Sequence, residues 1–303
     1  MSKLVVVGSV NADHVLRVPR FPQPGETLTG RQYQVISGGK GANQAMAAAR
    51  LGADLAFIAC VGDDAFGLNT IAQFQEAGVD TAHMRVQPNQ PTGIAMIQVS
   101  DSGENAICLS PESNAALSAD LINQASDVIH AAEYLLIQLE TPLDGVVAAV
   151  ELAQINETKV VLNPAPAVPL SDTLLQHVYM ITPNETEAEV LTGVKVTDDT
   201  TAQYAANQLH AKGIKLVVIT LGSRGAWVSD DGQGKLISGF IVDAVDTTAA
   251  GDTFNAGLVM ALMEGKPLES AMRFAQAAAA LSVTRFGAQS SIPTRKEVDQ
   301  FLG

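Results

Sequence analysis

The segment Asp246–Phe254 (DTTAAGDTF) joins small residues to a carboxylate at the expected start of a helix. Ala249, Ala250 and Gly251 have no bulky side chain, so their backbone N–H groups are accessible to an anion. A helix N-terminus provides unpaired N–H donors and about half a positive charge, which suits a phosphoryl group in transfer. Asp252 would lie in the first turn, where it could take a proton from an attacking hydroxyl. An Asp there also stabilises many ordinary helices, and the segment alone favours that simpler interpretation.

A second small-residue segment, Ser37–Gln44 (SGGKGANQ), opens the first predicted helix. Glycines such as Gly39 allow a ligand to approach the backbone closely, while Lys40 and Asn43 offer donors to hydroxyl groups. The segment is not a Walker A loop, which requires four residues between its glycines followed by Gly-Lys-Ser/Thr. As a bare pattern it is a turn followed by a helix, which does not define a ligand by itself.

Polar side chains also follow two of the predicted strands. Asn11 and Asp13 come directly after the first strand, and Glu140 ends a later one. Such residues are well placed to hydrogen-bond a polyol, because α/β proteins bind ligands at the carboxyl ends of their strands. Solvation or capping of the strand ends is their commoner role, and the sequence leaves both interpretations open.

Two further loops could bind a nucleotide and its metal ion. Thr182–Glu187 (TPNETE) follows a strand and opens a helix, so Asn184 and Glu187 could orient a hydrated Mg²⁺ near phosphates. The first threonine of this segment could instead be a simple helix cap. Thr220–Gly225 (TLGSRG) follows an apolar strand and could cradle a nucleotide, or could be a glycine-bearing hairpin.

The composition argues against several classes of function. With 18 basic and 32 acidic residues, the 303-residue chain has a formal net charge of −14 and no basic cluster, which disfavours nucleic acid or an anionic membrane as partner. Two isolated cysteines, Cys60 and Cys108, favour a reduced, cytoplasmic setting over a disulfide scaffold or zinc site. We expect no membrane span and no signal peptide. The five histidines are scattered and no G-x-S-x-G elbow occurs, so hydrolase chemistry fits poorly.

The elements that must position these residues alternate along most of the chain. Short β-branched runs and segments of helical period predict one α/β domain over residues 1–303, with a mostly parallel sheet flanked by helices on both faces. The expected strands are 4–10, 55–61, 134–139, 159–162, 179–182 and 216–220, with antiparallel edge strands at 225–230 and 234–240. The expected helices are 41–51, 66–77, 119–130, 143–155, 185–191, 201–211, 251–264 and 268–285.

Two β-rich segments, at about 12–38 and 92–110, interrupt this alternation. Each alternates apolar and polar residues, and each contains a turn signal, at Pro22–Gly25 and Asp101–Gly103. Together they could form one small sheet that closes over a site at the carboxyl ends of the main strands. Two separate decorative hairpins are equally compatible with the pattern.

Taken in order, these segments resemble the ribokinase family of carbohydrate kinases. The resemblance runs from Val6–Asp13 (VVGSVNAD) to Gly287–Gln289 (GAQ) and so covers essentially the whole chain. Its most specific phrases are Phe21–Thr27 (FPQPGET) and Gly38–Gln44 (GGKGANQ). Each motif is weak alone, but their order and spacing together are specific. Fructokinase-like and adenosine-kinase-like relatives usually differ at the position of Lys40.

The resemblance implies transfer of the terminal phosphate of ATP to the 5-hydroxyl of D-ribose, in an α/β domain whose β lid also forms a homodimer. Asp252 would be the base, with Ala249, Ala250 and Gly251 as the anion hole. The residues that match sugar-binding positions are Asn11, Asp13, Gly39, Lys40, Asn43, Glu140 and Asp252. Those that match ATP-binding positions are Asn184, Thr220, Gly222, Gly225, Gly251 and Gln276. Asn184 and Glu187 would order Mg²⁺ through water, and a K⁺ activator would be held, mostly by backbone oxygens, at Asp246, Thr248, Ser282, Arg285, Gly287 and Ser291.

The chain departs from the family pattern at two places. The wider family usually has Gly-Ala-Gly-Asp where this chain has Ala249–Asp252 (AAGD), a change that keeps the N–H groups. Where the family more often has Gly-Ala-Asn-Ala, this chain has Glu112–Ala115 (ESNA), which leaves open how that segment packs near the sugar and lid. The alternatives are a kinase for deoxyribose, another pentose or a nucleoside, and a non-catalytic sugar-binding regulatory protein.

Overall fold

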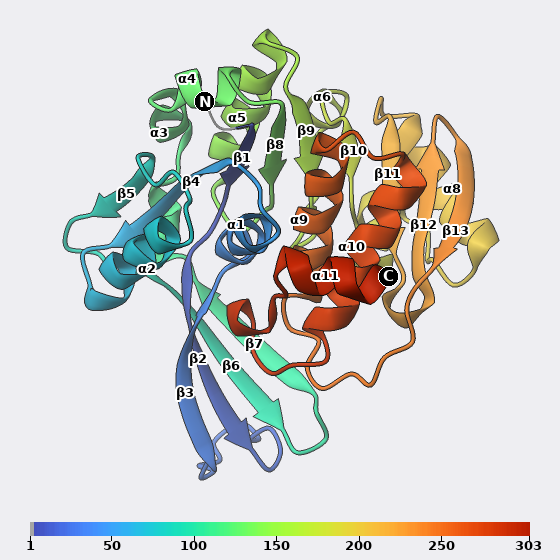
Figure 1. Cartoon of the computed structure of the whole chain (residues 1–303). Helices are drawn as coiled ribbons and strands as arrows, with labels where there is room; N and C mark the ends of the chain where they lie inside the picture. The colour runs from blue at the N-terminus through green and yellow to red at the C-terminus, as the bar shows by residue number, and fades with distance from the viewer. Residues whose placement is uncertain (1–2) are drawn as a thin grey trace.

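The computed structural model describes residues 3–303 and contains two β-sheets (Figure 1). The large sheet has nine strands in the order β13-β12-β11-β10-β9-β8-β1-β4-β5. These are β1 (Leu4–Val7), β4 (Leu55–Gly62), β5 (Met84–Gln87), β8 (Tyr134–Ile137), β9 (Lys159–Leu162), β10 (Met180–Ile181), β11 (Leu216–Thr220), β12 (Gly225–Asp230) and β13 (Gln233–Ser238). The strands from β5 to β11 in this order run parallel, and β12 and β13 form an antiparallel edge. The predicted fold class is confirmed.

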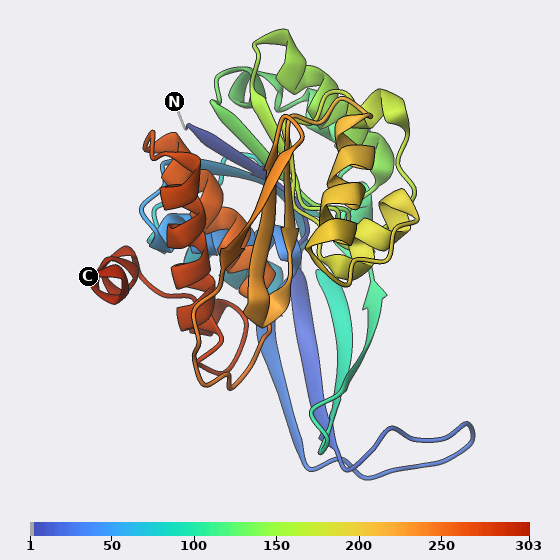
Figure 2. The same ribbon diagram turned by 90° about the vertical axis from the view of Figure 1, so that its right-hand side faces the viewer.

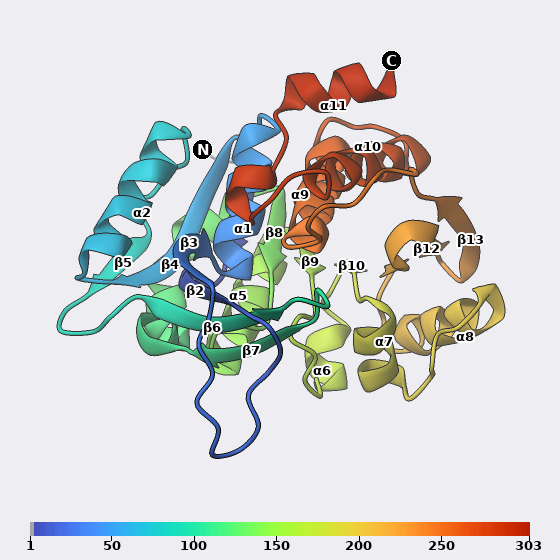
Figure 3. The ribbon, with the colours of Figure 1, turned by 90° about the horizontal axis from the view of Figure 1, so that it is seen from below.

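Helices cover both faces of the large sheet, as the view along the layers in Figure 3 shows. One face carries α1 (Lys40–Arg50), α2 (Ala65–Glu76), α9 (Ala250–Met263), α10 (Leu268–Ser282) and α11 (Arg295–Leu302). The other carries α3 (Ala119–Asn123), α4 (Ser126–His130), α5 (Leu143–Ile155), α6 (Asp172–Leu175), α7 (Glu185–Thr192) and α8 (Asp199–His210). Within β1, Leu4 and Val6 join the first core while Val5 and Val7 join the second. Burial on both faces explains why the strands are almost continuously apolar.

The two β-rich segments form one four-stranded sheet in the order β3-β2-β6-β7, which we call the small sheet. Its strands are β2 (Asn11–Val18), β3 (Gln32–Gly38), β6 (Gly93–Ser100) and β7 (Asn105–Ser110). It is therefore not a pair of separate hairpins, because β2 pairs with β6 from the other segment along its whole length. The small sheet projects from the body of the molecule (Figure 2).

Several elements differ from the sequence-based expectation, and the short elements β5 and α6 were not expected. The helix expected over 119–130 is two short helices, because the chain leaves helical geometry at Ala125 (φ −108°, ψ 17°). Periodicity cannot detect this break, since Ile122 and Ile129 are buried on either side of it. The last helix, α11, was not expected, although its capping box of Thr294 and Glu297 is readable in the sequence. Among residues 3–303, every helix is too short or too polar to cross a lipid bilayer.

Candidate active site

Helix α9 begins at a backbone turn rather than at a side-chain cap. Ala249 precedes it with φ 59° and ψ 13°, in the left-handed region, and no side chain caps the first turn. An alanine in this region costs roughly 1 kcal/mol, which glycine avoids. Within the described chain, no heavy atom beyond its own helix and neighbours lies within 4 Å of where a Cβ of Gly251 would be. The first turn has no side-chain cap, and its Ala250 N–H makes only a long bond of 3.3 Å to the carbonyl of Thr247, so the turn can bind an anion.

The Asp252 carboxylate lies beside this turn and is held by two amide donors. Asn43 Nδ2 donates to Oδ2 at 3.0 Å, and Gln44 Nε2 donates to Oδ1 at 2.9 Å. Asp252 is 7% exposed. Burial raises the pKa of its carboxyl above the usual value, and the Lys40 ammonium and the two amide donors oppose that shift. The result is a carboxylate that is a stronger base than an exposed aspartate and is oriented by α1.

Three further charged groups gather around Asp252. Burial raises the pKa of Asp13 to about 7, and the carboxylates of Glu140 and Asp252 act in the same direction. Glu140 Oε2 accepts hydrogen bonds from the Ser9 hydroxyl at 2.6 Å and from the Lys40 backbone N–H at 3.0 Å. Burial alone would lower the pKa of the Lys40 ammonium, but the surrounding carboxylates raise it. The Lys40 ammonium thus lies among several carboxylates, which are those of Asp252, Glu140, Glu187 and Asp13.

The predicted sugar-binding residues carry polar atoms that the protein leaves without partners. Asp13 Oδ1 and Asn43 Oδ1 are buried and have no hydrogen-bond partner among the described residues. Buried polar atoms are usually paired, so these two atoms beside Asp252 are available to accept hydrogen bonds from a ligand. Gly39 completes the turn beside them with φ 90°, and a Cβ there would lie 2.8 Å from the backbone nitrogen of Asn11. Asn11 is buried too, and its Oδ1 accepts from Asn114 Nδ2 at 2.8 Å.

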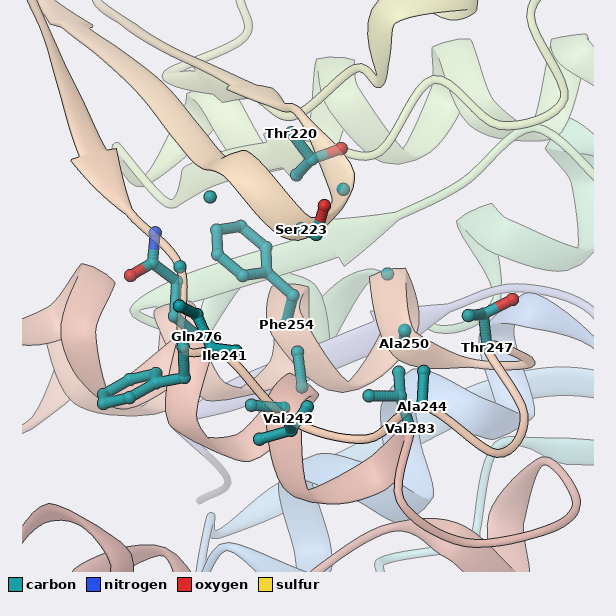
Figure 4. Close-up of a pocket in the computed structure, with 17 residues that line it drawn as sticks. Thr220, Ser223, Ile241, Val242, Ala244, Thr247, Ala250, Phe254, Gln276 and Val283 are labelled. Carbon is teal, nitrogen blue, oxygen red and sulfur yellow. The ribbon is translucent and has the colours of Figure 1, made fainter.

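Two adjoining cavities extend from Asp252. A polar cavity of about 240 Å³ is lined by charged and amide groups, including Lys40, Asn184, Glu187 and Asp252. A larger and mostly apolar cavity of about 570 Å³ opens beside it (Figure 4). The two share the lining residues Thr220, Thr247, Ala250 and Gly251. The sizes and linings suit phosphates in the first cavity and a flat heterocycle in the second.

The structure brings the residues predicted for nucleotide binding to these cavities. Thr220, Gly222, Gly225, Gly251 and Gln276 line the larger one, and Asn184 lines the smaller one. Gln276 Nε2 donates to the carbonyl of Ile237 at 2.7 Å, while its buried Oε1 has no partner among the described residues.

Asn184 and Glu187 form a capping box at the start of α7. Glu187 N donates to Asn184 Oδ1 and Asn184 N donates to Glu187 Oε2, each at 2.8 Å. The box occupies one oxygen of each side chain, and both residues line the polar cavity. Burial raises the pKa of the Glu187 carboxyl. The pair can therefore cap a helix and still order the water shell of a cation.

Two loops were predicted to bind a monovalent cation, one before α9 and one after α10, and they are joined by a hydrogen bond. Asp246 Oδ1 accepts from the backbone N–H and hydroxyl of Thr248, at 2.9 and 2.7 Å. Asp246 Oδ2 accepts from the Gly287 N–H at 3.0 Å, which joins the loops. Of the other predicted residues, Ser282 and Ser291 are buried, whereas the Arg285 guanidinium donates to Glu297 at 2.6 Å.

Sequence reasoning missed three polar residues of the site. Gln44 was part of a quoted motif without a role, and Asn163 and Asn255 were not singled out. Asn163 directly follows β9 and lines the polar cavity, so the strand-end rule that selected Asn11 would have found it. Asn255 lies one turn after Asp252 on α9 and lines the same cavity.

A buried carboxylate beside an anion-binding turn, with phosphate-sized and base-sized cavities behind it, is the arrangement that phosphoryl transfer to a hydroxyl requires. The class that this fold and site define is that of small-molecule kinases. A model of the pfkB family of carbohydrate kinases matches residues 1–295, and the chain belongs to this family.

Individual relatives within the family give a more specific comparison. A ribokinase of Haemophilus influenzae is 56% identical over 299 residues, which cover 99% of this chain and 98% of the relative. A deoxyribokinase of Salmonella typhi is 35% identical over 301 residues, with 99% and 98% covered. The structure of Arabidopsis thaliana ribokinase complexed with ribose and ATP superposes with a TM-score of 0.92 at 34% identity, covering 99% of this chain and 98% of that one.

Proposed function

We propose that this chain phosphorylates the 5-hydroxyl of D-ribose with ATP. The observation that carries the proposal is the position of Asp252, between buried acceptors without partners and the uncapped start of α9. The high identity to a ribokinase over the full chain supports ribose as the sugar. Two free cysteines, Cys60 and Cys108, fit a reaction in the reducing cytoplasm, where ATP is made.

The proposed reaction is an in-line displacement. Asp252 accepts the proton of the 5-hydroxyl as its oxygen bonds to the γ-phosphorus, and the bond from that phosphorus to the β–γ bridging oxygen breaks to release ADP. The N–H groups of Ala249, Ala250 and Gly251 stabilise the charge that spreads over the γ-phosphoryl oxygens. Lys40 also lines the polar cavity and adds positive charge there. Asp13 and Asn43 hold the sugar hydroxyls, which fixes the 5-hydroxyl at the base.

The residues present fit two cations. Asn184 and Glu187 would hold the water shell of Mg²⁺, which neutralises phosphate charge when bound. The loops joined by the hydrogen bond between Gly287 and Asp246 would hold K⁺. We expect turnover to rise with K⁺ and much less with Na⁺, and equal rates in the two salts would remove the monovalent site.

The small sheet is proposed to act as a lid over the sugar and as the contact of a homodimer. Its strand β2 begins with Asn11 and Asp13, so movement of the sheet reaches the sugar site directly. Tyr33, Val35 and Met96 lie on one face of the sheet by register and are 58%, 42% and 56% exposed. A cluster of exposed apolar side chains on a projecting sheet is typical of a protein–protein contact.

The test is ADP release with Mg²⁺ and K⁺, measured in parallel on ribose, deoxyribose, fructose and adenosine. Fast turnover on ribose alone, with phosphate on oxygen 5 of the product, supports the proposal. Deoxyribose is included because the Salmonella relative is named a deoxyribokinase. Preference for deoxyribose would keep the kinase chemistry and change the sugar. No turnover on any of the four would favour a non-catalytic sugar-binding protein.

A further inference from the structure

A row of buried amides lies behind Asp252, and of its three members only Asn163 lines the polar cavity. It consists of Gln138 at the end of β8, Gln44 on α1 and Asn163 at the end of β9. Gln44 is fully buried and Gln138 is 1% exposed. We propose that Gln44, fixed in one orientation by Gln138, is a positioning residue that holds the Asp252 carboxylate for proton transfer. This inference rests on the proposed function, in which Asp252 is the base.

Every polar atom of the Gln44 side chain has a partner. Its Nε2 donates to Asp252 Oδ1 at 2.9 Å and to Asn163 Oδ1 at 3.0 Å. Its Oε1 accepts from Gln138 Nε2 at 2.6 Å. An amide has two N–H donors, so both are used, and neither is available for a sugar or phosphate.

Chemistry fixes the direction of this row of hydrogen bonds. The Asp252 carboxylate can only accept while ionised, and Asn163 directs its own Nδ2 to the carbonyl of Thr182 at 3.2 Å. Both therefore present oxygens to Gln44. A flipped Gln44 amide would place its oxygen against two acceptors and its nitrogen against the Gln138 donor. Gln138 itself packs against Gly8, where any Cβ would collide with Gln138 Oε1.

Asn43 and Gln44 therefore have different roles at the Asp252 carboxylate. Asn43 binds Oδ2 and also carries an unpartnered Oδ1 that can face the sugar. Gln44 binds only Oδ1 and has no exposed surface, so it acts on the base and not on the substrate. A donor to the ionised carboxylate opposes the effect of burial and keeps Asp252 able to accept a proton.

The test uses Gln44→Met, Gln138→Met and the double variant in the full-length chain, because Met keeps the volume and removes every strong donor and acceptor. For Gln44→Met we expect kcat to fall about tenfold, which corresponds to one lost hydrogen bond to a charged group. The KM for sugar should stay within about twofold, because substrate contacts remain. The acid limb of the kcat–pH profile should move to higher pH, since the carboxyl loses a donor to its ionised form.

Gln138→Met should also lower kcat and move the acid limb to higher pH, but by less than Gln44→Met. The double variant should have the kcat and acid limb of Gln44→Met, because Gln138 acts only through Gln44. Gln154→Met changes a half-buried residue of α5 away from the row, so it is the matched control and should have the kinetics of the wild type. Fully additive losses, or a raised KM with an unmoved acid limb, would overturn the assignment. If Gln44→Met does not fold, the acid limb of Gln138→Met decides the question alone.

A second readout does not need turnover. Carboxyl-labelled protein is titrated by NMR, and the Asp252 signal is identified by its loss in Asp252→Asn. An upward shift of its titration in Gln44→Met supports the inference, and an unchanged titration contradicts it. Absence of turnover in the wild type would instead contradict the proposed function, and the titration would still test the hydrogen bond.

Discussion

At the scale of single residues, burial and nearby charges shift the pKa values of the charged groups in the site in opposite directions. Asp252 and Asp13 are both buried carboxyls with raised pKa values, and both lie near the Lys40 ammonium. The Asp252 oxygens already accept two amide donors, whereas Asp13 Oδ1 is without a partner. We therefore assign proton transfer to Asp252 and substrate contact to Asp13.

Asp252→Asn should lose most turnover while still binding ribose and ATP. The amide cannot accept the hydroxyl proton, and loss of a general base typically costs about 10²- to 10⁴-fold in rate. The measurement is kcat by ADP release, with calorimetric titration of ribose and ATP on the same preparation. Turnover close to that of the wild type would remove Asp252 from the base role.

Asp13→Asn should change how stability depends on pH. The Asp13 carboxyl titrates near pH 7 in the folded protein and near 3.8 when unfolded, so rising pH ionises the unfolded chain first. The wild type therefore loses stability across this interval, and the variant does not. The stability of Asp13→Asn relative to wild type should grow from pH 4 to pH 7 and then level off. Urea unfolding at several pH values checks this, and a difference independent of pH would show that Asp13 titrates normally.

At the scale of elements, strand ends and helix starts decide where the chemistry lies. Alternating β-branched and helical segments predicted the large sheet, and its carboxyl edge explains the placement of Asn11 and Glu140. Gln44 could not be assigned a role in this way, because its partners Gln138 and Asp252 lie 94 and 208 residues away in the chain. Periodicity identifies the buried face of a helix, but it does not identify which distant polar groups meet there.

The start of α9 gives a prediction about backbone conformation. Ala249 has φ 59°, so Ala249→Gly removes strain of roughly 1 kcal/mol and adds a comparable entropic cost on folding. We expect this variant to keep both stability and activity. Ala249→Val places a β-branched residue in the same conformation and should lower both. Thermal unfolding and kcat check the pair, and a fully active Ala249→Val would show that the turn does not need this geometry.

At the scale of the whole molecule, the helix-covered large sheet and the projecting small sheet share one site. The large sheet and its helices form two buried cores that support Asp252 and the larger cavity. The small sheet leaves the body at Asn11, Gly38 and Gly93, beside the sugar residues. Asn114, which follows the last strand of this sheet, donates to Asn11 and accepts from the backbone N–H of Val10 at 2.9 Å. The position of the small sheet and the geometry of the sugar site are therefore linked through hydrogen bonds.

This link makes the oligomeric state testable through the small sheet. Val35 and Met96 flank His14 in one row of the sheet, and both are exposed. Val35→Glu with Met96→Glu should give a monomer by sedimentation velocity, because like charges would face each other across an apolar contact between two copies. We also expect a higher KM for sugar. Ile155→Glu changes an apolar residue on α5 that is 65% exposed, and it should leave the oligomeric state of the wild type unchanged. A wild-type monomer, or a double variant that still dimerises, would place the contact elsewhere or exclude it.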